Sequence, residues 1–368
     1  MEGPRALKVQ NYVGVIRTPT GLDIEVLPKR CHSAEDPRAI RRLLLRMIAA
    51  SHGIPPQVAD VADIQILDQP FTEWMALTFV RLAADVVRRG LRRDYLRVEG
   101  RERYLRGQLD LPRQLRAGPA ATLDFHVRHD VFSLDGPENR LIRAAVDRVA
   151  RNTRVALTWR LARELTILLA EIPASRTIQL DLERWRDDRL MAHYTPIRGV
   201  CELILTGRTP FAVAGEHAAE SMLFPMERLF EDCVERAIRK RLPPGYMLQP
   251  QPRSHTLCRY AGRDWFELKP DFVVRGSGRA WILDAKWKLL NSDAKARFGV
   301  SQADLYQLNA YGQTYLGGHG DLFLVYPRTP DFPDIGAVFE MAPGLRVHVL
   351  PIDIEAETFD LGAMLSAR

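Results

Sequence analysis

Two short apolar segments in the last third of the chain constrain the fold most, because each carries charge where a buried strand normally has none. The first, Leu268–Val274, contains Asp271, and the second, Trp281–Trp287, contains Asp284 and Lys286. A glycine-containing turn between the segments predicts a β-hairpin. Side chains two positions apart in a strand share a face, so Asp284 and Lys286 are expected to lie together, with Asp271 close by.

The chemistry of these three side chains indicates a metal site. Two carboxylates and an amine buried at one point are costly unless they pair or bind a cation. Two carboxylate ligands suit Mg²⁺, and a nearby lysine can hold or polarise an attacking water. This pattern resembles the signature of the PD-(D/E)xK nucleases. A second Asp-x-Lys at Asp293–Lys295 lies in a polar run without a strand pattern. The alternative interpretation is a structural ion pair between Asp284 and Lys286 on an edge strand.

A helix is predicted before this hairpin, over about residues 221–241, from apolar residues at helical spacing. Glu227, Glu231 and Glu235 follow one another along it at steps of four. One of them could reach the metal site, and Glu231, beside Phe230, is the candidate that we prefer. The alternative is an ordinary solvated acidic face.

A second helix is predicted to begin near Asp304. It places Gln307 and Tyr311 one turn apart on the same face. This pair resembles the Gln-x-x-x-Tyr motif that RecB-like members of the nuclease superfamily carry after the catalytic lysine, near the active site and the DNA. The resemblance implies that Gln307 positions Lys286 or a phosphate and that Tyr311 lies near DNA. The alternative is amphipathic packing of the helix.

The charge of the chain is compatible with nucleic-acid binding but does not prove it. Its 368 residues carry a net charge of +6, and the pI is about 9.2. Arginines crowd residues 88–116, where Arg92 and Arg93 are our candidates for contact with DNA phosphates. The alternative is a solvated helix face and hairpin.

Several other classes of protein find no support in the sequence. The longest apolar runs are shorter than a membrane span, and residues 1–8 show no secretory signal. The 4 cysteines are widely scattered, which speaks against a zinc site or a disulfide framework and favours a reducing cytoplasm. A phosphate-binding Gly-x4-Gly-Lys-Ser/Thr loop is absent, so the chain is not expected to hydrolyse nucleotides itself. No hydrolase or dinucleotide motif indicates a small-molecule enzyme.

The patterns predict a mixed α/β (α+β) protein with three regions. Residues 1–70 should hold a β-hairpin over 12–28 and a helix over 40–50, and residues 71–210 should form a middle α/β region. Residues 211–368 should form a restriction-endonuclease-like core with the order αβββαβ. In the middle region, helices are expected at 71–89, 138–150 and 157–172, a helix or buried segment at 194–205, and strands at 104–109 and 123–131. The last strands of the core are expected at 322–326 and 346–352.

Segments along nearly the full length resemble the McrC family, the nuclease subunits of McrBC 5-methylcytosine restriction systems. Those segments are Asn11–Ile16, Ile24–Lys29, Arg42–Met47, Gly90–Tyr95, Leu105–Leu109, Asp135–Leu141, Lys269–Asp271 and Leu283–Lys288. The resemblance implies a DNA endonuclease, an endodeoxyribonuclease that hydrolyses phosphodiester bonds with Mg²⁺, with Mn²⁺ as a substitute. Asp271, Asp284, Glu231 and the carbonyl of Ala285 would hold the metal, and Lys286 would act on the water.

The same resemblance implies a partner. A separate McrB-like AAA+ hexamer would bind and hydrolyse GTP, recognise methylated double-stranded DNA and translocate it. The present chain would dock on that ring through its N-terminal half, most of all the middle region, stimulate the GTPase and cut. Arg17 in the first hairpin is a candidate for contact with the partner.

Two alternatives to this function remain. A stand-alone PD-(D/E)xK nuclease of repair type would cut DNA without partner or nucleotide. A non-cutting regulator of an AAA+ motor would use the nuclease fold as a DNA clamp, although a clamp has no use for a converging acid pair.

Overall fold

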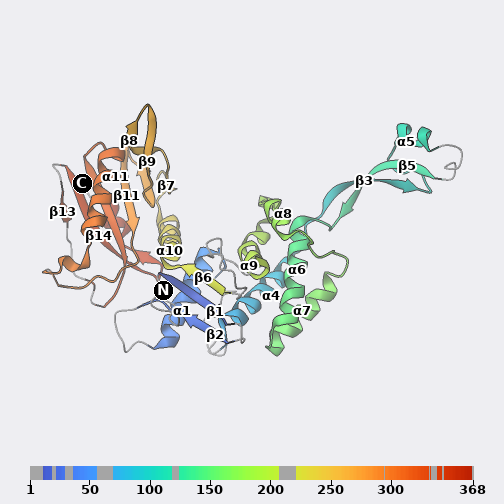
Figure 1. Ribbon diagram of the computed structural model, residues 1–368, viewed down its shortest axis with the longest axis horizontal. Helices are drawn as coiled ribbons and strands as arrows, with labels where there is room; N and C mark the ends of the chain where they lie inside the picture. The colour runs from blue at the N-terminus through green and yellow to red at the C-terminus, as the bar shows by residue number, and fades with distance from the viewer. Residues whose placement is uncertain are drawn as a thin grey trace. The chain divides into compact units, whose positions relative to one another are not determined.

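The computed structural model forms two compact units (Figure 1). The first combines residues 1–68 with residues 208–368, and the second is the continuous stretch 69–207. The N-terminal region that we expected as a separate part therefore belongs to the unit that holds the C-terminal core. The expected boundary near residue 210 lies outside the described residues. The structure describes residues 11–18, 22–29, 36–55, 69–117, 124–206, 221–293, 295–330, 332, 338–341 and 344–366.

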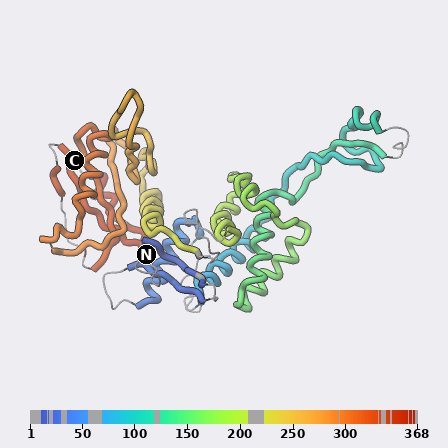
Figure 2. Tube along the Cα trace, in the orientation of Figure 1, coloured from blue at the N-terminus to red at the C-terminus, as the bar shows by residue number. Residues whose placement is uncertain are grey.

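The predicted N-terminal hairpin is confirmed, and it gains a third strand from far along the chain. β1 (Tyr12–Arg17) pairs antiparallel with β2 (Asp23–Val26) and, on its other side, with β6 (Ser221–Pro225). Figure 2 shows these N-terminal strands in blue beside the yellow segment that leads into the next helix. The predicted helix is wrong for residues 221–225, because they complete this sheet and the helix α10 (Met226–Arg241) begins only after Pro225.

The predicted helix over residues 40–50 is confirmed as α1 (Pro37–Ser51). The Asp36 side chain accepts a hydrogen bond from the backbone N–H of Arg38 and so caps the helix start. α1 packs against α10, and the Ser51 hydroxyl donates to the Asp232 carboxylate across that contact. The N-terminal region thereby supports the helix that carries Glu231.

The core of the first unit is a seven-stranded mixed sheet with the order β13-β14-β12-β11-β10-β7, where β15 pairs with β14. β10 and β11 form the predicted hairpin, with Val273 opposite Ile282, and β11, β12 and β14 run parallel. α11 covers one face, where its Leu308 packs with Val273 and Ile282. The elements are β7 (Met247–Pro250), β10 (Phe272–Gly276), β11 (Arg279–Ala285), η3 (Arg297–Gly299), α11 (Gln302–Tyr315), β12 (Gly320–Pro327), β13 (Val338–Glu340), β14 (Leu345–Asp353), β15 (Thr358–Phe359) and α12 (Leu361–Ser366).

One hairpin stands outside this sheet. β8 (His255–Tyr260) and β9 (Arg263–Leu268) pair only with each other among the described strands, and they are inserted between β7 and β10. The sequence did not lead us to expect this insertion. Without it, the order α10-β7-β10-β11-α11-β12 is the αβββαβ order expected, and the mixed α/β class is confirmed.

The second unit is a helical body with a β-ribbon. The predicted helices are confirmed, and α7 ends at Leu168, earlier than expected. Within this unit, Figure 1 shows β3 and β5 running away from the helices. The elements are α4 (Phe71–Arg89), β3 (Asp94–Glu102), β4 (Gln108–Leu109), α5 (Leu111–Arg116), β5 (Phe125–Ser133), α6 (Pro137–Asn152), α7 (Ala156–Leu168), α8 (Ile178–Glu183), η2 (Arg189–Tyr194) and α9 (Thr195–Thr206).

The strand predicted at residues 104–109 is wrong except for its last two residues, which form β4. The long strand of this ribbon is instead β3, which pairs with β5 along its whole length. Most side chains of β3 are exposed on both faces, so its sequence lacks the alternation of apolar and polar residues that reveals a half-buried strand. The strand predicted at residues 123–131 is confirmed as β5.

None of the helices in the described part of the chain is long and apolar enough to cross a membrane.

Candidate functional site

The structure brings Asp271, Asp284 and Lys286 together at the carboxyl end of β11. Asp284 lies in β11 with 1% of its surface exposed, and Lys286 follows directly after the strand. Asp271 precedes β10, whose Phe272 pairs with Leu283, so the register sets the two aspartates opposite each other. The predicted convergence of two carboxylates and an amine is therefore present.

Short contacts fix the three side chains. Lys286 Nζ lies 2.7 Å from Asp284 Oδ2. The backbone N–H of Ala285 donates to Asp271 Oδ2 at 2.7 Å. The backbone N–H of Lys286 donates to the carbonyl of Val325 at 2.9 Å, which extends the pairing of β11 with β12 past the strand end and holds the lysine in place.

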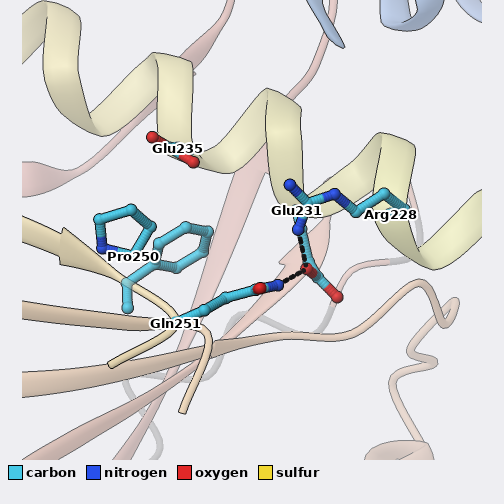
Figure 3. Close-up of a pocket in the computed structure, with 6 residues that line it drawn as sticks. Arg228, Glu231, Glu235, Pro250 and Gln251 are labelled. Carbon is cyan, nitrogen blue, oxygen red and sulfur yellow. Dashed lines mark hydrogen bonds and ion pairs between the residues drawn. The ribbon is translucent and has the colours of Figure 1, made fainter. Parts of the chain in front are cut away.

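Glu231 on α10 lies at the same site but has partners of its own. Its Oε2 accepts hydrogen bonds from Gln251 Nε2 at 3.0 Å and from Arg228 Nη1 at 3.3 Å (Figure 3). Of the three glutamates along the helix, Glu227 and Glu231 line the pocket that holds Asp271 and Lys286, whereas Glu235 lines a smaller neighbouring pocket.

The pocket around Asp271 and Lys286 has a volume of about 300 Å³, and more acidic than basic side chains line it. Its floor comes from the ends of β10 and β11, and its walls come from α10 and from the start of α11. The lining residues are Glu227, Glu231, Asp271, Ala285, Lys286, Trp287, Lys288, Ser301 and Asp304.

The acidic groups at this site resist ionisation. Burial first, and the charge of Asp284 next, raise the pKa of Asp271 to about 8. Burial also raises the pKa of Asp284, although Lys286 works in the opposite direction, and burial raises the pKa of Glu231. Burial alone would lower the pKa of Lys286, but its ion pair with Asp284 raises it, so the amine stays charged.

A chain of hydrogen bonds runs from the lysine to the segment before Asp271. Lys286 Nζ donates to Gln307 Oε1 at 3.2 Å, and Gln307 Nε2 donates to the Tyr311 hydroxyl at 2.8 Å. The Tyr311 hydroxyl in turn donates to the carbonyl of Lys269 at 2.9 Å. Gln307 thus lies where we expected it, in contact with Lys286.

The donor set fits a divalent cation held by two carboxylates. Apart from the ion pair with Lys286, neither oxygen of the buried Asp284 has a hydrogen-bond partner within the described residues. A buried carboxylate with so few partners, next to the half-buried Asp271, is well suited to a cation. Among the described residues, no three or more acidic, histidine or cysteine side chains are grouped closely enough to hold a metal ion. Glu231 therefore lies too far from the two aspartates to form a three-ligand cluster with them in this structure. Mg²⁺ commonly takes one or two carboxylates and completes its shell with waters and phosphates.

Two of the residues predicted to bind DNA are placed differently by the structure. Arg92 is buried, and its guanidinium lies near the carboxylates of Asp94, Glu138 and Asp188, so it holds the second unit together. Tyr311 is also buried, since its ring packs in the apolar core under α11 and its hydroxyl donates to the Lys269 carbonyl, which leaves little of it for contact with DNA.

The predicted contacts of Arg93 with DNA and of Arg17 with the partner protein stay predictions. Arg93 is exposed, with its guanidinium 5.8 Å from the centre of the Phe132 ring. Arg17 ends β1, and its side chain lies outside what the structure describes.

Sequence reasoning missed three residues of the site. Arg228 and Gln251 hold Glu231, and Asp304 lines the pocket from the first turn of α11. Arg228 could have been found, because it lies three positions before Glu231 on one helix. Gln251 carries no signal of its own, since only the fold brings the end of β7 to α10.

Residues 7–327 match the family described as McrBC 5-methylcytosine restriction system component. The chain belongs to this family. The match spans most of the sequence and confirms the McrC-like resemblance derived from individual segments.

Among solved structures, the chain is similar to one described as a half-complex from a tetradecameric assembly of Thermococcus gammatolerans McrB AAA+ hexamers with bound McrC. The TM-score is 0.65 at 24% identity, covering 94% of this chain and 78% of that chain. A cryo-EM structure of the Thermococcus gammatolerans McrBC complex is similar with a TM-score of 0.50 at 24% identity, covering 64% of this chain and 68% of that chain. At this identity the likeness shows the shared fold. No curated protein matches the chain.

Proposed function

We propose that this chain is the Mg²⁺-dependent DNA endonuclease subunit of an McrBC-like restriction system. The observation that supports this most is the meeting of Asp271, Asp284 and Lys286 at one point of the sheet. A structural ion pair would need only Asp284 and Lys286. It gives no reason for a second carboxylate beside it, the half-buried Asp271, whose pKa is raised to about 8.

Each residue of the site has a role in this proposal. Asp271 and Asp284 would hold Mg²⁺ or Mn²⁺, with the Ala285 carbonyl and Glu231 as further ligands. When bound there, such an ion would supply positive charge beside the scissile phosphate. Lys286 stays charged, so it donates a hydrogen bond to a phosphate oxygen or to the oxygen of the attacking water, orients that water and stabilises the developing negative charge.

The residues next to the amine set its position. The Lys286 amine donates to Gln307 and pairs with Asp284, which leaves one of its three N–H donors for the substrate. Arg228 and Gln251 hold the carboxylate of Glu231 at the edge of the pocket until a ligand competes for it.

The partner in this proposal is an McrB-like AAA+ hexamer that binds GTP. This chain docks on the hexamer and stimulates its GTPase. It cuts methylated double-stranded DNA in the cytoplasm, as part of an antiviral defence. Family membership and the McrB-bound assemblies among the similar structures support this. The β3–β5 ribbon of the second unit offers a docking surface, because Tyr95, Tyr104 and Phe132 are exposed on or beside it. Several of its arginines are paired with acids, such as Arg128 of β5 with Glu99 of β3, which favours a protein partner over DNA for this ribbon.

The test is cleavage of methylated and unmethylated plasmid with Mg²⁺, with and without the neighbouring AAA+ protein and GTP. Asp284→Ala and Lys286→Ala should each lower the cleavage rate by at least about 100-fold, the range of lost electrostatic catalysis. Asp293→Ala and Lys295→Ala are the matched controls, because they remove the same residue types from the Asp-x-Lys that lies outside the site. The controls should cut like the wild type.

The outcomes separate the alternatives. Cutting that needs the partner, GTP and Asp284 supports the McrBC-like function. Cutting by the chain alone, still dependent on Asp284, would make it a stand-alone nuclease. A rise in partner GTPase without cutting under any condition would identify a regulator.

A further inference from the structure

We propose that the β8–β9 hairpin is a DNA-contacting ribbon that holds the duplex beside the scissile phosphate. This inference rests on the proposed nuclease function and adds to it a surface that would hold the substrate. Its evidence is the position of the hairpin, its fixed base, its exposure and its charge.

The hairpin begins and ends at the candidate active site. It leaves the sheet directly after Gln251, which donates to Glu231, and it returns just before Asp271. The backbone N–H of Gln251 donates to the carbonyl of Asp271 at 2.8 Å, so the two ends of the insertion are joined there. Whatever the ribbon binds is therefore held next to the carboxylates.

The base of the hairpin is fixed to α11, the helix that carries Gln307. The Tyr315 hydroxyl lies 3.1 Å from the carbonyl oxygen of Pro252 and 2.8 Å from that of Leu268, one on each side of the hairpin. The His255 ring lies 4.3 Å from the Tyr315 ring, centre to centre. A base held at both strands makes the ribbon a positioned element and not a loose loop.

Beyond this base the ribbon has almost no protein around it. Figure 1 shows β8 and β9 standing out from the sheet of their unit. Four large apolar side chains are exposed, Leu257 (56%), Tyr260 (70%), Trp265 (46%) and Phe266 (68%). Phe266 has a φ of +60°, a conformation that side chains rarely adopt, and it lies at a position that the strand pairing skips. An isolated ribbon gains little stability from such residues, so their exposure indicates a binding surface.

The charge of the ribbon identifies DNA as the partner. Arg253, just before β8, and Arg259 and Arg263 on the strands are exposed, and they outnumber the two acids of the ribbon, Asp264 and Glu267. Of these three arginines, only Arg259 has an acidic partner among the described residues, Asp264 at 3.1 Å. Unpaired arginines beside the candidate active site supply the positive charge that attracts a phosphate backbone to it. Arginines bind phosphates, two-stranded ribbons fit the major groove, and apolar side chains insert between base steps.

The experiment measures binding of a fluorescent DNA duplex by anisotropy over a range of salt concentrations. The full chain carries Asp284→Ala so that it does not cut, and it is tested with and without the neighbouring AAA+ protein and GTP. In that chain, Arg253→Ala with Arg263→Ala should weaken binding at least about 10-fold at low salt. The slope of log K against log salt should fall by about two, because each phosphate contact contributes about 0.9.

Two further variants sharpen the test. Trp265→Ala with Phe266→Ala should weaken binding about 10-fold with an unchanged salt slope, because base stacking involves no counterion release. Arg239→Ala with Lys240→Ala removes two exposed cations from the end of α10, and this control should bind like the parent. All variants change exposed side chains, and unchanged melting curves check their folding.

The outcomes decide on the ribbon independently of catalysis. Equal binding by ribbon and control variants, or no binding by the parent with or without the AAA+ protein, overturns the proposal. A change of assembly mass with unchanged DNA binding would assign the ribbon to a protein partner instead. Failure of wild-type chain to cut, with ribbon-dependent binding intact, would remove the nuclease function and leave the ribbon. DNA cleavage and binding that depend on Asp284 but not on the ribbon would support the nuclease function and overturn the role of the ribbon.

Discussion

Asp271 and Asp284 are costly residues for this fold, because each is a carboxylate that the protein takes out of water. Asp271 accepts a hydrogen bond from the backbone N–H of Ala285, and Asp284 forms an ion pair with the Lys286 amine. Burial nevertheless raises the pKa of both carboxyl groups. A fold selected for stability alone would have apolar side chains here. The cost is expected at a site whose ligand completes it.

This cost has a defined pH dependence. Because the pKa of Asp271 is raised to about 8 in the fold, the unfolded chain releases this proton at lower pH than the folded chain. The stability that the protonated group contributes is therefore lost as the pH rises from about 4 to about 8. In EDTA, the thermal midpoint of the wild type should fall over the upper part of this range, and that of Asp271→Asn should fall less. Equal falls would contradict the burial of an ionisable carboxylate.

Divalent cations should reverse the effect. Mg²⁺ binds the ionised carboxylates, so it should raise the thermal midpoint of the wild type more at about pH 8 than at about pH 6, by up to about 2.7 kcal/mol of stability at 100 times its Kd. Asp284→Ala should lose this response, while the control Asp293→Ala should keep it. Differential scanning calorimetry measures the shift without any nuclease assay. If neither Mg²⁺ nor Mn²⁺ changes the thermal midpoint of the wild type, the prediction of a metal site is wrong.

Gln307 and Tyr311 act on the same site by position. Gln307→Ala removes the acceptor that fixes the Lys286 amine and should slow cleavage by about 10- to 100-fold, as misplacement of a catalytic group does. Tyr311→Phe removes the hydroxyl that orients the amide, and its effect should be smaller. Cleavage rates and thermal midpoints of the two variants check this. Unchanged rates in Gln307→Ala would show that the contact is only packing.

At the scale of elements, the sequence predicts what depends on near neighbours. The β10–β11 hairpin, α10 and α11 could be predicted because charge, turn and helical spacing are local signals, and they sufficed to bring Asp271, Asp284 and Lys286 together. β6 could not, because only its pairing with the distant β1 makes it a strand. The β8–β9 hairpin was missed for another reason, since both of its faces are exposed and no alternation marks it.

The join between β1 and β6 can be broken at a single residue. Gly14 has a φ of +128°, and a Cβ there would lie 2.1 Å from the carbonyl oxygen of Met222 on β6. Gly14→Ala should therefore lower the free energy of unfolding by more than the roughly 1–3 kcal/mol of backbone strain alone. Gly53→Ala is the control, because Gly53 also has a positive φ but nothing lies within 4 Å of its Cβ position. Denaturant unfolding should show the larger loss for Gly14→Ala, and equal losses would contradict the close approach of the two strands.

At the scale of the whole molecule, one unit is inserted into the other. The second unit is the continuous stretch 69–207, and its core includes Trp74, Phe79, Ile142 and Ile197, all within that stretch. A fragment of residues 69–207 should therefore fold alone, with helical circular dichroism and a cooperative thermal transition. A fragment of residues 208–368 lacks β1 and α1 and should be much less stable. A fragment 69–207 that stays unfolded would show that its core needs the first unit.

The insertion also sets an order of events during synthesis. Asn11 and Glu227, which share a hydrogen bond, are 216 positions apart in the chain. The three-stranded sheet cannot be completed until the ribosome has made the entire second unit and then β6. At about 5–20 residues per second, this delay lasts on the order of ten seconds or more. The helix that carries Glu231 and the two aspartates are translated later still. A nascent chain, and any product truncated before β11, would thus hold a folded second unit but no assembled acidic pocket.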